Sequence, residues 1–272
     1  MATGRTDRLE NSTRNLTVGV TCYNERHSIA LTLDSLLSAL DGRGLSWEAI
    51  VVDDVSADDS VAVVERFIAE EGSGRIRLHR NQRNQGLVRN VYMIAEMGTG
   101  TRFWYVSGDN TVPVEAAGKI LDSIDRADIV IPKVLTYVGR PLHRKFISRA
   151  YTLLVNLLSG LDIYYYNGSS VYLRADVVHY GKQLGGYGYS AEMIIRLIDD
   201  GRSYFEVPVV YTDRKEGKAS ALRLPHLVQV CGFFGRLVAR RLRRVFGVHH
   251  RETASRGTSP RQPSLGGPAD ER

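Results

Sequence analysis

LTVGVTCYNERHSIALTLDSLLSAL, residues 16–40, is the stretch of sequence that decides the fold. Residues 16–22 are apolar and rich in β-branched side chains, as expected of a buried strand. Residues 23–28 are polar, and from Ile29 to Leu40 the apolar side chains recur with helical spacing. The stretch therefore predicts a strand, a loop and an amphipathic helix.

The same unit recurs along the chain. We predict strands at 47–52, 76–78, 103–106 and 129–131, and helices at 61–68, at 87–97 and from about 113 onward. Strands that alternate with helices of this length form a mostly parallel sheet with helices on both faces. The fold class is therefore α/β. The second half is less regular, with a helix at 146–158, a strand at 171–173, a helix at 191–198 and a strand at 204–211.

Polar residues follow three of these strands directly. They are Tyr23, Asn24 and Glu25 after the first, Asp53 and Asp54 after the second, and Ser107, Asp109 and Asn110 after the fourth. A single cluster is explained by helix capping, at which Asp and Asn excel. Three clusters predict a binding site, because ligands of such sheets lie outside the carboxyl ends of the strands.

Length, composition and charge exclude several classes. The chain has 272 residues, of which 43% are hydrophobic and 24% charged, as in a globular protein with a large core. Its two cysteines are too few and too far apart for a disulfide framework or a zinc site. Residues 223–251 hold seven arginines and no acid, which accounts for the net charge of +6. The rest is nearly neutral, so we expect no nucleic-acid partner.

The basic stretch predicts a membrane contact. Apolar residues at helical spacing, with arginines on other faces, predict a basic amphipathic helix at 225–248 that lies on a membrane surface. Docking on the preceding domain of the chain or on a second subunit is the alternative. The longest uncharged stretches have 12 residues, fewer than the roughly 18 needed for a span. Without an apolar signal region at the N-terminus, we expect a cytoplasmic, peripheral protein. We expect segment 1–15 to be flexible and tail 249–272 to be disordered.

The order of the motifs resembles family 2 glycosyltransferases of the GT-A fold. Within that family the chain is most similar to the dolichyl-phosphate mannose synthase-like branch, the polyprenyl-phosphate glycosyltransferases. The motifs are Thr21-Cys22-Tyr23-Asn24-Glu25, Asp53-Asp54-Val55-Ser56, Asn84-Gln85-Gly86, His143-Arg144-Lys145 and the closing segments at 188–192, 206–208 and 213–217. The resemblance implies one domain at 16–224, with a donor half at about 16–133 and an acceptor half at about 134–224.

The resemblance also implies roles for individual residues. Those expected to bind the nucleotide sugar are Thr21, Tyr23, Asn24, Glu25, Val52, Asp53, Asp54, Asn84, Gly86, Ser107, Gly108 and Asp109. Those expected to bind the acceptor are Arg144, Arg149, Asn167, Arg214 and Lys218. The family's D-x-D motif falls on Ser107-Gly108-Asp109, so Asp109 alone is expected to hold the divalent metal, Mg²⁺ or Mn²⁺. Asn110 could add a carbonyl oxygen.

The expected reaction is inverting transfer of a hexose, from a donor of the GDP-mannose or UDP-glucose type to a polyprenyl phosphate at the cytoplasmic membrane face. A phosphate nucleophile needs no general base, whereas a glycan or natural-product hydroxyl does, and Glu192 is then the candidate base. Asp109 and Glu192 are therefore the candidate catalytic residues.

Loss of the first D-x-D acid keeps a third alternative open, a catalytically inactive, membrane-associated partner protein. A nucleotide-dependent oxidoreductase is disfavoured, because no G-x-G-x-x-G follows the first strand. The oligomeric state, a homo-oligomer included, stays open.

Overall fold

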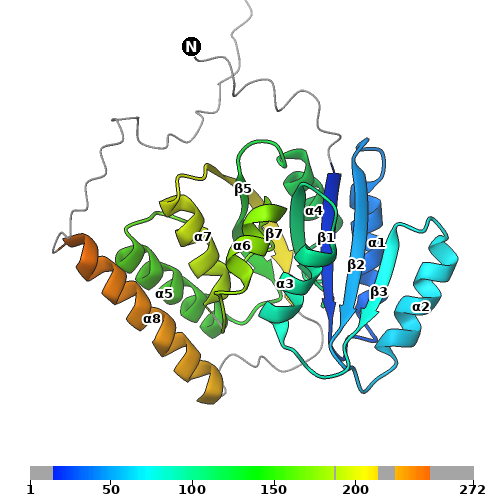
Figure 1. The fold of residues 1–272 in the computed structure, drawn as a ribbon, viewed down its shortest axis with the longest axis horizontal. Coiled ribbons are helices and arrows are strands. Elements are labelled where there is room, and N and C mark those ends of the chain that lie inside the picture. Colours follow the sequence, from blue (N-terminus) through cyan, green and yellow to red (C-terminus); the bar gives the residue numbers. More distant parts are fainter. Residues whose placement is uncertain (1–14, 187, 214–223, 246–272) are drawn as a thin grey trace, which may run out of the picture.

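A seven-stranded sheet organises the protein in its computed structural model, which describes residues 15–186, 188–213 and 224–245. The strands are β1 (Asn15–Cys22), β2 (Ser46–Asp53), β3 (Ile76–Arg80), β4 (Arg102–Ser107), β5 (Ile129–Val138), β6 (Val171–Leu173) and β7 (Tyr204–Thr212). Their order is β3-β2-β1-β4-β6-β5-β7, and only β6 runs antiparallel to its neighbours. Figure 1 shows this sheet between layers of helices.

Helices cover both faces of the sheet. They are α1 (Ile29–Leu40), α2 (Ser60–Glu71), α3 (Leu87–Met97), α4 (Val114–Asp122), α5 (Leu142–Ser159), α6 (Arg174–Gly181), α7 (Tyr189–Asp199) and α8 (Leu224–Val245). One core cluster joins the sheet to α1, α2 and α4, through side chains such as Leu33, Val64 and Ile120. The other joins it to α3, α6 and α7, through Ile94, Val177 and Ile194. The predicted α/β fold is confirmed.

Two elements differ from the sequence expectation. The fifth strand was predicted at 129–131 but continues to Val138, because it pairs with β7 along its whole length through an irregularity between Val134 and Thr136. Helix α6 was not predicted, since RADVVHYG has no apolar stripe at helical spacing. Within the described helices, none is long and apolar enough to cross a membrane.

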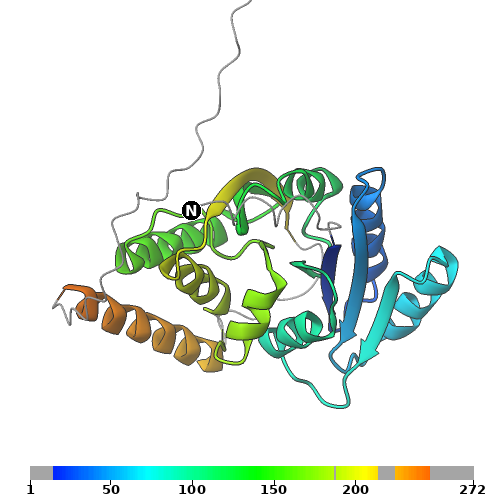
Figure 2. The same ribbon diagram turned by 45° about the horizontal axis from the view of Figure 1, so that its top comes forward.

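Helix α8 lies beside α5 at the end of the molecule farthest from β3 and α2 (Figures 1 and 2). Its Phe233 and Leu237 are buried in the second core cluster. Arg240 forms an ion pair with Asp199 of α7 and donates to the carbonyl of Ser159 at the end of α5, at 3.0 Å. The described part of the predicted basic helix therefore packs on α5, α7 and the second core cluster. Residues 246–248, the segment 1–14 and the tail 249–272 lie outside the described residues.

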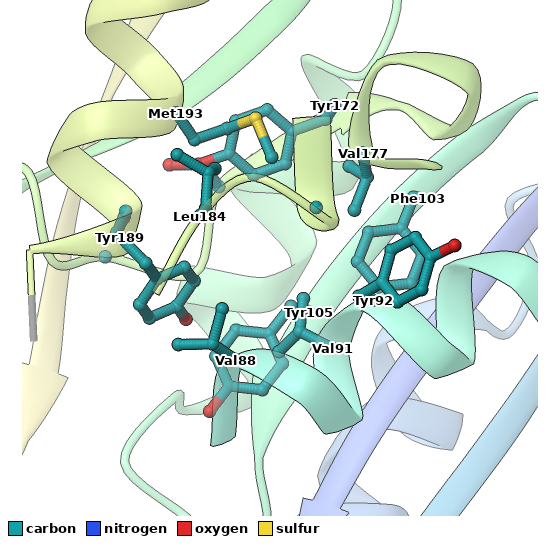
Figure 3. Close-up of a pocket in the computed structure, with 14 residues that line it drawn as sticks. Val88, Val91, Tyr92, Phe103, Tyr105, Tyr172, Val177, Leu184, Tyr189 and Met193 are labelled. Atoms are coloured by element: carbon teal, nitrogen blue, oxygen red, sulfur yellow. The ribbon is translucent and has the colours of Figure 1, made fainter. Parts of the chain in front are cut away.

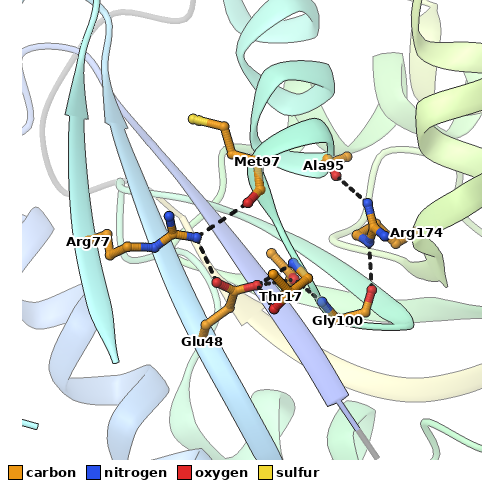
Figure 4. Close-up of polar contacts among 8 residues, drawn as sticks. Thr17, Glu48, Arg77, Ala95, Met97, Gly100 and Arg174 are labelled. Carbon is orange, nitrogen blue, oxygen red and sulfur yellow. Dashed lines mark hydrogen bonds and ion pairs between the residues drawn. The ribbon is translucent and has the colours of Figure 1, made fainter. Parts of the chain in front are cut away.

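Polar contacts fix the amino-terminal edge of the sheet (Figure 4). Glu48 of β2 accepts hydrogen bonds from the hydroxyls of Thr17 at 2.9 Å and Thr99 at 2.8 Å. Arg77 of β3 binds the same carboxylate at 2.7 Å. Burial alone would raise the pKa of Glu48, but the hydrogen bonds from Thr99, Thr17 and Arg77 outweigh it and hold the pKa below its usual value. The ionised carboxylate thus connects three strands.

Replacing this carboxylate tests its contribution to stability. A depressed pKa means that the ion stabilises the fold at pH values above the unfolded pKa, and that this stability is lost as the pH falls through the folded pKa. We expect Glu48→Gln to lower the free energy of unfolding by about 1–3 kcal/mol at pH 7, and the difference from the unsubstituted protein to shrink below about pH 4.5. Urea unfolding across pH measures both. Glu65→Gln, on the exposed face of α2, should leave stability unchanged at every pH.

Candidate active site

The register of the parallel strands gathers the three polar clusters at one edge. Cys22 of β1 lies opposite Asp53 of β2, and Thr21 lies opposite Ser107 of β4. The loops that follow these strands therefore emerge side by side. They form one wall of a cleft of about 1170 Å³.

The structure divides the predicted site residues into three groups. Those that line the cleft are Thr21, Tyr23, Glu25, Asp54, Asn84, Gly86, Ser107, Asp109, Arg144 and Asn167. Those that do not line it are Asn24, Val52, Asp53, Gly108, Arg149 and Glu192. Arg214 and Lys218 lie outside the described residues.

Asn24 and Asp53 hold together the loops that follow β1 and β2. The buried Asp53 carboxylate accepts hydrogen bonds from the backbone N–H of Ser56, at 3.1 Å, and from its hydroxyl. Asn24 donates its backbone N–H to the Ser56 hydroxyl at 2.9 Å and accepts from the N–H of Ala57 at 2.8 Å. Val52 is buried in the core. Asn24 and Asp53 thus fix the positions of two loops at this edge of the sheet.

Asp54, in contrast, reaches the cleft and organises the loop before α3. Its carboxylate accepts hydrogen bonds from the backbone N–H groups of Gln85 at 2.7 Å and Gly86 at 2.9 Å, and from the Asn81 amide at 2.7 Å. Asn84 donates to the Asp54 carbonyl at 3.1 Å. Gly86 has a φ of +78°, which glycine adopts without strain. The side chains of Asp54 and Asn84 thus fix the Asn84-Gln85-Gly86 turn.

Asp109 stands on the turn after β4. The hydroxyl of Thr111 donates to its carboxylate at 2.9 Å. Gly108 passes so close to β1 that an added Cβ would lie 2.9 Å from both the Thr21 carbonyl oxygen and the Ile29 side chain. A glycine is therefore required to bring Asp109 to the cleft. The Asn110 amide oxygen accepts from Ser35 of α1 at 3.5 Å, and Asn110 does not line the cleft.

Two arginines form the cationic part of the opposite wall. Arg144 of α5 forms an ion pair with Asp213, at 2.8 Å, and Arg140 approaches the same carboxylate at 3.8 Å. Arg140 also stacks on the ring of Tyr137, 4.0 Å from its centroid. Two guanidinium groups and one carboxylate leave a net positive charge facing the cleft. Arg140 was not predicted from the sequence, although it lies in a basic segment just before α5 and four positions before Arg144.

Tyrosines line the same wall. The hydroxyls of Tyr137 and Tyr165 are 3.1 Å apart, and the rings of Tyr137 and Tyr211 meet edge to face at 5.7 Å. Burial raises the pKa of Tyr137 well above its usual value, and raises that of Tyr211 as well. These hydroxyls therefore stay protonated at neutral pH and offer neutral hydrogen bonds. At the end of β1, burial raises the pKa of the Cys22 thiol to about 11, so the thiol is neutral too.

The α7 end of the cleft is closed by a glycine-rich turn and by α8. Gly185, Gly186 and Tyr189 line the cleft, and so does Gln229 of α8. Close by, a small apolar pocket lies between α3, β4 and α7, where the Val88, Tyr105 and Tyr189 side chains approach one another (Figure 3). Its volume of about 20 Å³ is too small for a sugar.

Glu192 faces away from the cleft, toward α8. It is buried, and its carboxylate binds Arg196 at 2.8 Å and Arg236 of α8 at 2.9 Å. Arg149 is also outside the cleft, with its guanidinium 4.9 Å from the centre of the Tyr164 ring. The structure thus does not bring these two predicted residues to the others.

Substitution of Asp54 tests how the loop before α3 is held. In Asp54→Asn one of the two backbone N–H groups loses its acceptor, so we expect about 1–3 kcal/mol less stability. We also expect at least about tenfold faster hydrogen exchange at the amides of Gln85 and Gly86. Asp59→Asn, at an exposed position whose side chain makes no capping hydrogen bond, is the matched control. Unchanged exchange in Asp54→Asn would refute this account of the loop.

Comparisons with known proteins identify the family. Residues 17–180, more than half of the chain, match the profile of glycosyl transferase family 2. An undecaprenyl-phosphate mannosyltransferase of Micrococcus luteus is 27% identical over 216 residues, which cover 72% of this chain and 83% of that protein. An undecaprenyl-phosphate 4-deoxy-4-formamido-L-arabinose transferase of Pectobacterium carotovorum is 23% identical, over 79% of this chain and 65% of its own length.

Solved structures show the same fold. A mannosyltransferase from Pyrobaculum calidifontis, in complex with GDP-Man and Mn²⁺, superposes with a TM-score of 0.58 at 21% identity. The match covers 81% of this chain and 64% of that one, so here, as with the Pectobacterium relative, the chain spans slightly less than two thirds of the other protein. With the family profile and the shared fold together, this chain belongs to glycosyl transferase family 2 and is a glycosyltransferase of the GT-A fold.

Proposed function

We propose that the protein transfers a hexose, with inversion, from a nucleoside diphosphate sugar to a polyprenyl phosphate at the inner face of the cytoplasmic membrane. The observation that carries this proposal is the contrast between the two walls of the cleft. One wall presents Asp109 among polar strand ends, and the other presents the paired guanidiniums of Arg140 and Arg144. The names of two relatives, both undecaprenyl-phosphate sugar transferases, support the acceptor class.

The donor would lie along the polar wall, over the loops that Asp53 and Asp54 hold in place. Asp109 would hold a divalent cation, Mg²⁺ or Mn²⁺. A single carboxylate suits an ion whose other ligands are phosphate oxygens and water. Among the described residues no group of three or more His, Cys, Asp or Glu side chains is arranged to hold a metal ion by itself. Such an ion neutralises the negative charge of the pyrophosphate leaving group.

The acceptor phosphate would bind Arg140 and Arg144, because guanidiniums match phosphate oxygens in charge and geometry. A phosphate oxygen then attacks the anomeric carbon from the face opposite the leaving group. The new carbon–oxygen bond forms as the bond to the nucleoside diphosphate breaks, and the diphosphate leaves with the electron pair. Positioning and charge neutralisation are sufficient, since the phosphate is already ionised at neutral pH.

A hydroxyl acceptor fits the site less well, because it needs a general base. The acids among the described lining residues already have partners or an assigned role. Asp54 accepts three hydrogen bonds, Asp213 binds two arginines, and Glu25 accepts from Ser28 at 2.7 Å. Asp109 accepts from Thr111 at 2.9 Å and is the residue proposed to hold the cation. Glu192 is held by two arginines outside the cleft. We propose that Glu192 positions α8 and does not take part in the chemistry.

A transfer assay tests the reaction. Purified protein with Mg²⁺ or Mn²⁺ is given radiolabelled GDP-mannose and UDP-glucose in parallel, with a polyprenyl phosphate in detergent. We expect label in the organic phase that requires the metal and is lost in Asp109→Ala. Label in neither lipid nor free sugar would favour an inactive partner protein. Donor hydrolysis without lipid labelling would favour a hydroxyl acceptor.

Arginine variants test the acceptor wall. We expect Arg144→Gln and Arg140→Gln each to raise the KM for the polyprenyl phosphate at least about tenfold, with little change in the KM for the donor. Arg126→Gln, an exposed position that contacts Phe205 on the far side of β5, is the matched control. An equal effect of Arg144→Gln on both KM values would contradict an acceptor-specific role.

A pair of variants separates positioning from catalysis at Glu192. If the residue holds α8, Glu192→Gln and Arg236→Gln should lower the melting temperature by similar amounts, and both should keep turnover within about tenfold. Loss of a general base costs about 10²–10⁴ in rate. A loss of that size in Glu192→Gln alone, with Arg236→Gln still active, would establish the base and overturn the positioning role.

A further inference from the structure

Helix α5 exposes a long apolar surface. Six of its side chains, Leu142, Phe146, Ile147, Leu153, Leu154 and Leu157, share one side of the helix and are exposed, and we call them the α5 stripe. Leu142 is 82% exposed, Phe146 76% and Leu157 69%. Single exposed apolar residues are ordinary, but a contiguous group of this size on one helix marks a contact surface.

Packing of the domain does not account for the stripe. The side of α5 that faces the core presents Thr152, Val155 and Ser159, which are buried. Tyr151 meets α8, where its ring lies 6.4 Å from Phe233 and 5.9 Å from Phe234. The α5 helix therefore has its structural partners on other faces than the stripe.

The charge of α5 indicates the chemistry of the missing partner. The helix contains no acidic residue, and His143, Lys145 and Arg149 are exposed near the stripe. An apolar face flanked by cations matches a surface of anionic lipid headgroups over acyl chains. A second copy of the chain fits less well, because two such faces would bring like charges together.

Helix α8, which the sequence predicted to lie on a membrane, packs against the rest of the protein. Its Phe233 and Leu237 are buried in the domain core. Arg236 and Arg240 are paired with Glu192 and Asp199 of α7. These four side chains of α8 therefore make contacts within the protein, whereas the α5 stripe on the neighbouring helix is exposed to solvent.

The position of α5 links its surface to the cleft. Arg144, in the first turn of the helix, lines the cleft and binds Asp213. We propose that the α5 stripe inserts into a bilayer of anionic phospholipid, so that α5 lies in the membrane interface with the Arg140–Arg144 wall at the level of the phosphate headgroups. The membrane contact stands on the stripe alone, while its use in delivering a polyprenyl phosphate rests on the proposed function.

Vesicle sedimentation of the full-length protein tests the contact. We expect binding to phosphatidylcholine vesicles that contain about 30% phosphatidylglycerol, and weaker binding to phosphatidylcholine alone. Leu153→Glu and Phe146→Glu should each weaken binding at least about tenfold. Leu31→Glu, on α1 at the other end of the molecule, is the matched control, because Leu31 is 51% exposed and Leu153 59%. Circular dichroism melting confirms that each variant is folded.

Several outcomes would overturn the proposal. They are no vesicle binding by the unsubstituted protein, an equal loss in Leu31→Glu, or no loss in Leu153→Glu. Analytical ultracentrifugation tests the alternative that a second copy of the chain binds the stripe. A dimer that dissociates in Leu153→Glu would show that the stripe is a subunit interface.

Transfer assays separate this proposal from the proposed function. With a water-soluble, short-chain polyprenyl phosphate, Leu153→Glu should be as active as the unsubstituted protein, while its transfer to a long-chain acceptor in vesicles should fall at least about tenfold. Stripe-dependent vesicle binding without transfer to either acceptor would refute the function and leave the membrane contact standing. Transfer to both acceptors without vesicle binding would refute the membrane contact and leave the proposed function standing.

Discussion

The parallel register of β1 with β2 and β4 is the constraint on which the site depends. It sets Cys22 opposite Asp53 and Thr21 opposite Ser107, so that loops from three distant segments emerge at one edge. A slip of one residue would turn every apolar side chain of β1 to the wrong face. The register is held because both faces of β1 are buried, with Val18 and Val20 on one side and Gly19 against Ile94 and Phe103 on the other.

The two walls of the cleft are built from different chemical groups. On one side, carboxylates accept backbone hydrogen bonds, so that Asp53 holds the loop after β2 and Asp54 holds the loop before α3. On the other side, the guanidinium of Arg144 in α5 binds Asp213 after β7. Both walls depend on contacts between distant residues, since Gln85 lies 31 positions after Asp54 and Asp213 lies 69 positions after Arg144.

Elements with a clear apolar period could be predicted from the sequence, and contacts between distant residues could not. The helix at 87–97 and the strand at 171–173 have the predicted bounds, whereas α6 lacks the stripe that would have revealed it. The motif Asp53-Asp54 marks a site but does not tell which carboxylate reaches the cleft. Glu192 was a candidate base because of its place on the helix after a Gly-Tyr loop, and the structure pairs it with Arg236, 44 positions further along the chain. Nothing local signals that pairing.

Helix α8 has a consequence for how this protein can diverge. Phe233 covers Gly188 so closely that an added Cβ would lie within 2.4–2.8 Å of its ring atoms, and Gln229 stands in the cleft wall itself. The C-terminal helix is therefore a part of the catalytic body and not an appendage to it. In related proteins that lack this helix, no ring equivalent to Phe233 restricts position 188, which can then carry a side chain. Substitutions at positions 188 and 233 should therefore occur together over evolution.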